Sequence, residues 1–145
     1  MRLVLDTSVL VGELLRAPGR ARLGDDRLEL FLPEAMWTEV QVELPRRIAA
    51  FSRRRGLARA VADGLSDAAL AAIEANVVVL DAAIYAALEN EARARSLRDA
   101  QDWPVVASAL ALSAGIWTND NDFLGTGVAT WTTETLQHWL ERSVE

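Results

Sequence analysis

The chain has 145 residues, 51% of them hydrophobic, and a formal net charge of −6 at pH 7, which suits one domain with a substantial core and excludes two. It contains no cysteine, so disulfides, thiolate nucleophiles and zinc–sulfur sites are excluded, and its single histidine, His138, cannot build a Ser-His-Asp triad or a histidine metal cage. All fifteen basic residues are arginine, which excludes the lysine-dependent P-loop.

Two strands, each followed by a helix, are predicted in the first part of the chain. Residues 2–5 form a short aliphatic run that stops at Asp6, after which apolar residues recur at helical spacing. A second apolar run, residues 28–32, ends at a proline and leads into a helix that carries Glu39, with Glu43 one turn later on the same face. Asp6 is therefore expected at the carboxyl end of the first strand, with Glu39 near the end of the second.

The middle of the chain is predicted to be mostly helical. We expect helices over residues 46–63 and 66–74, separated by a break at residues 64–66. A buried strand over residues 76–80 and an alanine-rich helix over residues 81–96 follow.

Helices and strands alternate again in the last part of the chain. An apolar helix is predicted over residues 103–114, strands over residues 115–118 and 128–131, and a closing helix over residues 132–142. Strands that alternate with helices are typical of a parallel sheet with helices on both faces. The expected fold is a single domain, residues 1–145, built as a three-layer α/β/α sandwich around a central, mainly parallel sheet.

Five acidic residues are expected to converge at one edge of this sheet. Asp102 opens the apolar helix, which descends about 18 Å before the next strand climbs back by a similar height and ends just before Asp120 and Asp122. Ligands of open parallel sheets bind outside the carboxyl ends of the strands, and Asp6 and Glu39 reach the same edge. Converging carboxylates repel one another unless a cation lies between them, so the pattern predicts a divalent-metal site.

Each of these acids also has a purely structural interpretation. Asp102 is a good helix N-cap before a first-turn proline, and Asp6 is another candidate cap. Asp120 and the acid two residues later lie among asparagines, as in a polar turn. Glu39 and Glu43 fit a solvated helix face. The joint pattern favours the metal site, because independent caps and turn residues have no reason to lie at one edge of one sheet.

The acids also occur in a characteristic order. Asp6 precedes Thr and Ser, Glu39 follows the second strand, Asp102 opens a helix, and a Thr-x-Asp-x-Asp-Phe turn spans residues 118–123. This order resembles the PIN-domain nucleases, and most closely the VapC-like toxins of bacterial toxin–antitoxin pairs. The likeness runs the whole length of the chain; it is strongest from Asp102 through the turn and weakest over residues 44–80, where no motif is visible.

The resemblance implies a nuclease that hydrolyses RNA phosphodiester bonds with one or two Mg²⁺ or Mn²⁺ ions. The residues that match the family's metal ligands are Asp6, Glu39, Asp102, Asp120 and Asp122. Thr118, and less directly Thr7 or Ser8, is expected to orient a water or a carboxylate. Glu43 is a usable substitute for the helix-borne ligand, and Glu34 is a poorer one because it falls at the helix start.

The resemblance also implies partners, namely an RNA substrate, an antitoxin protein and a second copy of the chain in a homodimer. The negative net charge is compatible with RNA, because bound divalent ions offset several of the negative charges. Six arginines fall between residues 46 and 59 with no acid among them. We expect Arg53, Arg54 and Arg55 to contact RNA phosphates, although such a run also fits a solvated helix face.

Two other functions remain open. One is a PIN-like module that binds RNA or a protein without cleaving it, against which the full set of acids argues. The other is a metal-dependent phosphohydrolase that acts on small phosphate esters, which a narrow pocket would favour. No stretch is long and apolar enough for a membrane span, and Met1 leads directly into a strand-like run, so we expect a cytoplasmic protein without membrane contact.

Overall fold

A five-stranded parallel sheet forms the centre of the computed structural model, which describes residues 1–142. The strands are β1 (Arg2–Leu5), β2 (Glu29–Pro33), β3 (Val77–Leu80), β4 (Gly115–Trp117) and β5 (Thr130–Trp131). Their order is β3-β2-β1-β4-β5, and every neighbouring pair is parallel. All carboxyl ends therefore lie at one edge, as the sequence predicted.

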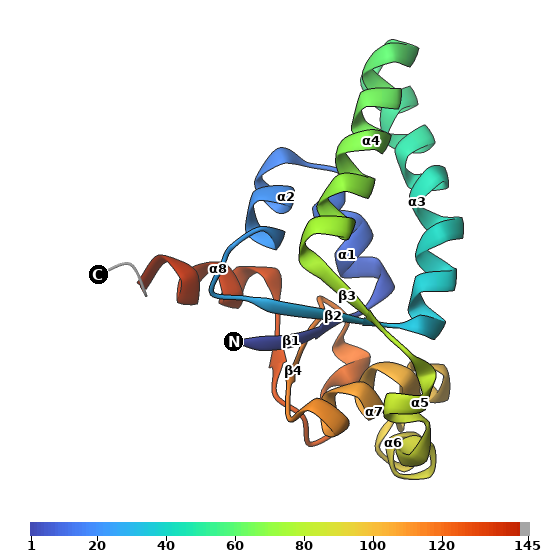
Figure 1. The fold of residues 1–145 in the computed structure, drawn as a ribbon, viewed down its shortest axis with the longest axis vertical. Helices are drawn as coiled ribbons and strands as arrows, with labels where there is room; N and C mark the ends of the chain where they lie inside the picture. Colours follow the sequence, from blue (N-terminus) through green and yellow to red (C-terminus); the bar gives the residue numbers. More distant parts are fainter. Residues whose placement is uncertain (143–145) are drawn as a thin grey trace.

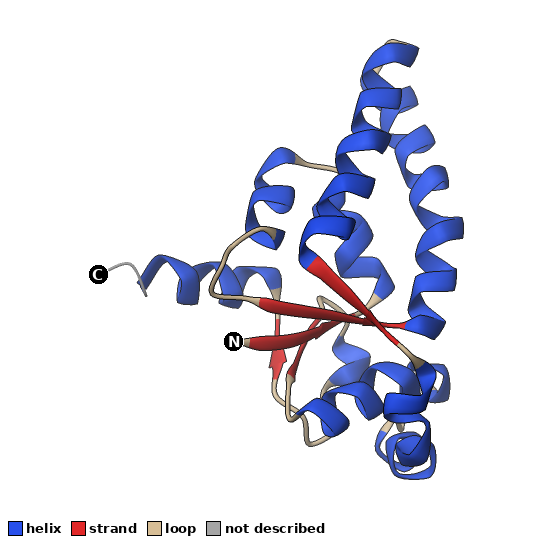
Figure 2. Cartoon of the chain, in the orientation of Figure 1, coloured by secondary structure: helices blue, strands red, loops and turns tan. Residues whose placement is uncertain are grey.

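Helices cover both faces of this sheet (Figures 1 and 2). One layer contains α1 (Thr7–Leu14), α2 (Ala17–Leu23), α3 (Glu34–Arg55) and α4 (Arg59–Asn76), and the other contains α5 (Ala82–Tyr85), α6 (Glu89–Arg95) and α7 (Trp103–Leu112). Helix α8 (Thr133–Arg142) follows β5, and short 3₁₀ turns span Ala86–Leu88, Ala100–Asp102 and Asn121–Phe123. The predicted three-layer α/β/α sandwich is confirmed. Among these helices, none is both long enough and apolar enough to cross a membrane.

The part of the hydrophobic core that positions the site lies between β1 and α7. Leu3, Val4 and Leu5 of β1 are fully buried, and the α7 segment from Pro104 to Ala109 is buried on all sides. This helix is apolar all round because the sheet covers one side of it and α6 covers another. The central strand and the helix that delivers Asp102 are thus held by the same hydrophobic packing.

The helix break predicted at residues 64–66 is wrong. Helix α3 continues through Pro45 to Arg55 and ends at Gly56, whose φ of +60° is the left-handed conformation that terminates helices. Helix α4 then runs without interruption through Gly64. A glycine inside a helix costs only about 1 kcal/mol relative to alanine, which the packing of α4 on α3 offsets.

Two further predictions are corrected. The strand expected to be buried is the sheet's edge strand β3, so Val78 and Val79 are 55% and 38% exposed. The single helix expected over residues 81–96 is divided into α5, a 3₁₀ turn and α6. Tyr85, at the first division, is buried and packs against Trp103 with 5.7 Å between ring centroids.

Candidate metal centre

The strand order reverses between β1 and β4, and such switch points are where open parallel sheets bind ligands. Asp6 follows β1 and Thr118 follows β4, so the two buried residues lie side by side. The Thr118 hydroxyl donates a hydrogen bond to Asp6 Oδ2 and accepts one from the backbone N–H of Asp120 at 3.0 Å. Asp6 Oδ1 accepts from the backbone N–H of Val9 at 2.7 Å. These hydrogen bonds therefore connect the carboxyl ends of β1 and β4.

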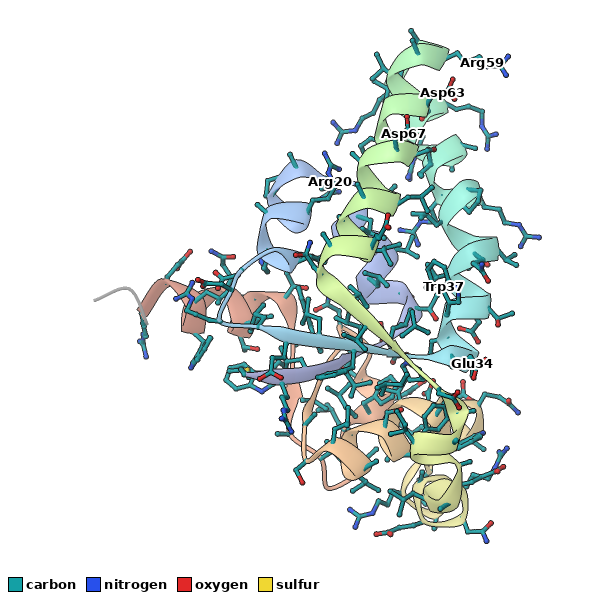
Figure 3. The ribbon with its side chains drawn as sticks, viewed as in Figure 1. Arg20, Glu34, Trp37, Arg59, Asp63 and Asp67 are labelled. Atoms are coloured by element: carbon teal, nitrogen blue, oxygen red, sulfur yellow. The ribbon has the colours of Figure 1, made fainter. Side chains whose placement is uncertain are left out.

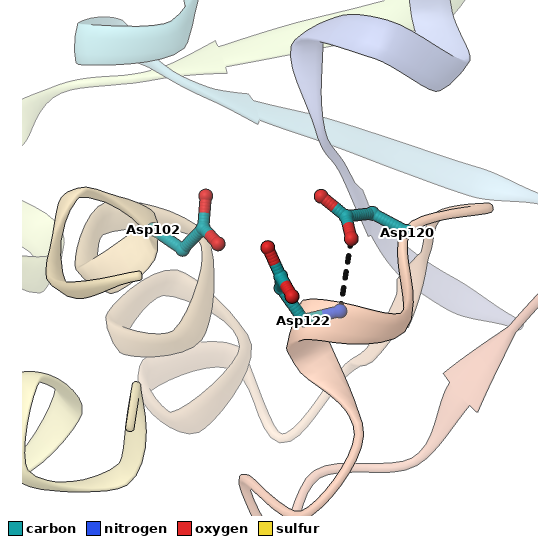
Figure 4. Close-up of side chains that lie close together, drawn as sticks. All are labelled: Asp102, Asp120 and Asp122. Atoms are coloured by element: carbon teal, nitrogen blue, oxygen red, sulfur yellow. Dashed lines mark hydrogen bonds between the residues drawn. The ribbon is translucent and has the colours of Figure 1, made fainter. Parts of the chain in front are cut away.

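Asp102, Asp120 and Asp122 converge beside this pair (Figure 4). One carboxylate oxygen from each of the three lies within 4.8 Å of the other two. Asp102 comes from the start of α7, and the other two come from the turn after β4, where Asp120 Oδ1 accepts a hydrogen bond from the backbone N–H of Asp122 at 2.9 Å. The predicted meeting of Asp102 with the two later acids is confirmed.

The structural interpretations hold for some of these acids and fail for one. Asp6 does cap α1, and Asp120 does close a turn. Asp102 occupies the N-cap position of α7, but its side chain accepts no capping hydrogen bond, because its backbone is already helical with φ −76° and ψ −2°. Its carboxylate instead points towards the other two acids (Figure 4). The cap interpretation of Asp102 is therefore wrong, and the other two structural roles coexist with the cluster.

Burial and mutual repulsion raise the pKa of two of the site's carboxyl groups. Burial is the largest cause that raises the pKa of Asp102, to about 7, and repulsion adds to it from Asp99, Asp120, Asp122 and Asp6. Burial also raises the pKa of Asp6, while the hydrogen bonds from Thr118 and Val9 lower it in part. The donor set consists of carboxylate oxygens alone, and it carries more negative charge than its surroundings stabilise. It therefore fits a hard divalent cation.

Glu39 lies near Asp6 but outside the cluster of three acids. The hydroxyl of Thr7, the residue after Asp6, donates to Glu39 Oε2 at 2.7 Å, and Glu39 is one of the charges that raise the pKa of Asp6. Its carboxylate is outside the 4.8 Å cluster of three acids. Glu39 is thus placed at the rim of the site, held by the residue next to the buried Asp6.

The two alternative glutamates are engaged elsewhere. Glu34 accepts a hydrogen bond from the backbone N–H of Ala82 at 3.0 Å and so holds the start of α5 (Figure 3). Glu43 forms an ion pair with Arg46 at 3.7 Å. Neither is among the charges that raise the pKa of Asp6 or Asp102.

The arginines predicted to bind RNA lie far from the acids. Arg53, Arg54 and Arg55 are exposed in the last turn of α3, at the tip of the α3–α4 pair that projects from the sheet (Figure 1). Arg59, at the start of α4, marks this tip in Figure 3. At 1.5 Å per residue, the tip is roughly 20 Å along α3 from Glu39. The structure does not bring these arginines beside the acidic cluster.

Other residues near the site were missed by sequence reasoning. Arg98 lies 3.6 Å from Asp122 as an ion pair, and Asp99 contributes to the raised pKa of Asp102. Both precede Asp102 in an irregular segment, where no periodicity indicates orientation. A cavity of about 550 Å³ also adjoins the site between α1 and α3. It is lined by Thr7, Ser8, Val11, Thr38, Glu39, Val42, Glu43 and Arg47.

Comparisons with known proteins agree with this architecture. The family model described as "PIN domain" matches residues 4–141. Among solved structures, the chain is similar to FitAcB from Neisseria gonorrhoeae, with a TM-score of 0.53 and 23% identity over 90% of this chain and 96% of that chain. It is also similar to FitAB bound to the IR36 DNA fragment, with a TM-score of 0.51 and 19% identity over 91% and 94% of the two chains. These structural likenesses show a shared fold. No curated protein matches the chain.

Proposed function

Because the chain belongs to the PIN domain family, we propose that it is a metal-dependent endoribonuclease that hydrolyses RNA phosphodiester bonds. The observation that carries the proposal is the convergence of Asp102, Asp120 and Asp122 at the carboxyl edge of the sheet. Three carboxylates at this spacing suit hard cations, and these cations suit phosphate oxygens.

We assign the metal ligands to the five acids of the site, namely Asp6, Glu39, Asp102, Asp120 and Asp122. A bound Mg²⁺ or Mn²⁺ supplies Lewis-acid polarisation of a phosphoryl oxygen and lowers the pKa of a water molecule. Thr118 orients the carboxylate of Asp6, and Thr7 orients that of Glu39, through the hydrogen bonds that they donate. These two hydrogen bonds hold the Asp6 and Glu39 carboxylates without any bound substrate. The Asp102 carboxyl group, whose pKa is raised to about 7, would hold a cation as the deprotonated carboxylate.

The biological setting is a further part of the proposal. The order of the acids resembles the VapC-like toxins, so we assign the chain to the toxin half of a toxin–antitoxin pair, with an antitoxin protein and a second copy of itself as partners. The fold likeness to FitAB, which was solved bound to a DNA fragment, is consistent with a role inside a larger assembly.

The test is cleavage of a mixed RNA pool and a matched DNA pool by the parent protein, with Mn²⁺, with Mg²⁺ or with EDTA. We expect RNA cleavage with either metal, none with EDTA, and none in Asp102→Asn. Asp63→Asn is the matched control, because Asp63 is exposed on α4 far from the site (Figure 3). Cleavage that survives EDTA or Asp102→Asn would contradict the proposal. RNA binding without metal-dependent cleavage would favour the non-cleaving module, and hydrolysis of small phosphate esters alone would favour the phosphohydrolase.

A further inference from the structure

The cavity between α1 and α3 has a cationic end. Glu39, Glu43 and Arg47 are four residues apart on α3, so they share one helix face, and all three line the cavity. Glu39 lies at the end that adjoins the acidic site, through its hydrogen bond with Thr7. Arg47 lies about 12 Å further along the helix axis. The cavity therefore leads away from the acids towards a guanidinium group.

The guanidinium of Arg47 is available to a ligand. Its neighbour Arg46 forms the ion pair with Glu43, and Glu39 is held by Thr7. Within residues 1–142, Arg47 makes no ion pair and no hydrogen bond, and its side chain is exposed. A free guanidinium presents a planar set of donors that matches phosphate oxygens. The clearest candidate ligand group at this end of the cavity is thus a phosphate.

The remaining walls of the cavity suit the rest of a nucleotide chain. Thr7, Ser8 and Thr38 bring hydroxyl groups, which donate to phosphate and sugar oxygens. Val11 and Val42 bring apolar surface, and Val42 is 49% exposed in a position where a ribose or base could cover it. Of the two glutamates in the lining, Glu43 is paired with Arg46, and Glu39 lies at the end beside the acidic site. The hydroxyls and the unpaired Arg47 therefore leave the rest of the groove suited to a phosphate–sugar backbone.

We propose that this groove binds the backbone of the substrate strand beside the bond to be cleaved, with Arg47 contacting a phosphate that is not itself hydrolysed. The proposal rests on the proposed function for the identity of the strand as a substrate. It makes Arg47 a positioning residue, because it lies too far along α3 to reach the reacting phosphate held at the acids. A strand that lies in the groove is directed along α3 towards Glu39.

The first experiment needs no cleavage. Binding of a short, fluorescently labelled single-stranded RNA is measured by anisotropy in EDTA at several salt concentrations, for the parent, Arg47→Gln, Arg47→Lys and Arg16→Gln. Arg16 is the matched control, since it is also an exposed arginine without a side-chain partner among the described residues. We expect Arg47→Gln to weaken binding about tenfold. The negative slope of log affinity against log salt should become shallower by about 0.7. Arg47→Lys keeps the charge and therefore the slope, and Arg16→Gln changes neither quantity.

The second experiment repeats the comparison during cleavage with Mn²⁺. Arg47→Gln is expected to raise KM with little change in kcat, because a contact to a spectator phosphate stabilises the bound substrate and the transition state equally. If the parent cleaves RNA while Arg47→Gln matches Arg16→Gln in slope and KM, the groove proposal is overturned and the proposed function stands. If the parent binds RNA without cleaving it, the proposed function fails, and the salt slope alone decides whether the groove holds RNA. Arg47→Gln that loses binding to a poly-glutamate peptide but not to RNA would assign the groove to an acidic protein partner instead.

Discussion

The hydroxyl of Thr118 donates a hydrogen bond to the carboxylate of Asp6, 112 positions away in the sequence. The same oxygen accepts the backbone N–H of Asp120. Because a hydroxyl donates and accepts at once, Thr118 joins the acid after β1 to the turn after β4. This contact sets the relative position of two of the proposed metal ligands.

Replacement of Thr118 by valine should therefore affect both stability and the site. The buried Asp6 carboxylate loses a donor, which costs about 1–3 kcal/mol of unfolding free energy. The pKa of Asp6 should rise further in the variant, because in the parent the hydrogen bond from Thr118 lowers this pKa. Chemical denaturation and RNA cleavage measure the two effects. Thr118→Ser is the control that keeps the hydroxyl, and a valine variant as stable and active as the serine variant would show that this hydrogen bond is dispensable.

The stability of the metal-free protein should depend on pH through Asp102. Its pKa is about 7 in the folded state against the ordinary aspartate value of 3.8, so between these values the folded state binds the proton more tightly than the unfolded state. This contribution to stability is complete below pH 3.8 and is lost as pH rises through 7. Asp102→Asn removes the titration, so its stability relative to the parent should be greatest at pH 8 and shrink towards pH 5. Melts in EDTA across this range measure the difference, with Asp63→Asn expected to follow the parent; parallel curves for parent and Asp102→Asn would contradict it.

Metal binding should stabilise the fold, and Asp120 should show why. Mn²⁺ that binds only the folded state adds about 2.7 kcal/mol at one hundred times its dissociation constant. Asp120→Asn should make the metal-free protein more stable, because it removes repulsion and the asparagine oxygen still accepts from the backbone of Asp122. The same change should reduce the gain from Mn²⁺. Thermal melts of parent and variant with and without the ion measure both effects. If the variant were less stable without metal and its melting temperature still rose as much as the parent's with Mn²⁺, Asp120 would be a turn residue and not a metal ligand.

One pair of variants can decide whether Glu39 or Glu43 is the metal ligand on α3. Glu39 faces Asp6 through Thr7, whereas Glu43 is paired with Arg46. Glu39→Gln should therefore lose most RNA cleavage and weaken Mn²⁺ binding, while Glu43→Gln, a matched change one turn away, should stay close to the parent. Cleavage rates and Mn²⁺ titrations of the two variants measure these effects. If Glu43→Gln lost more cleavage and Mn²⁺ binding than Glu39→Gln, the metal ligand on α3 would be Glu43.

The three arginines at the tip of α3 should contribute to the binding of long RNA only. Replacement of Arg53, Arg54 and Arg55 by glutamine should weaken binding and flatten the salt dependence for strands that extend roughly 20 Å along α3 beyond the site. Strands too short to reach the tip should bind the variant and the parent equally. Anisotropy titrations with a length series test this, and an unchanged salt slope for every length would identify the three arginines as a solvated helix face.

The sequence by itself determined the alternation of strands and helices and the meeting of Asp102 with Asp120 and Asp122. Both follow from local periodicity, because the rise of one helix and the strand after it fixes where their ends lie, within about twenty residues of chain. The position of Asp6 followed from the same rule, since ligands of a parallel sheet gather at the carboxyl ends of its strands.

Only the tertiary structure decided which of several similar side chains face the site. Glu39 and Glu43 share one helix face in the sequence pattern, and Glu34 falls at the helix start. In the structure Glu34 holds the start of α5, Glu39 accepts a hydrogen bond from Thr7, and Glu43 pairs with Arg46. The arginines of α3 divide in the same way: Arg47 lines the groove, and the last three are carried to the tip because the helix continues to Gly56. Periodicity reports which residues share a helix face, but packing against other elements decides what that face meets and how far the helix extends beyond it.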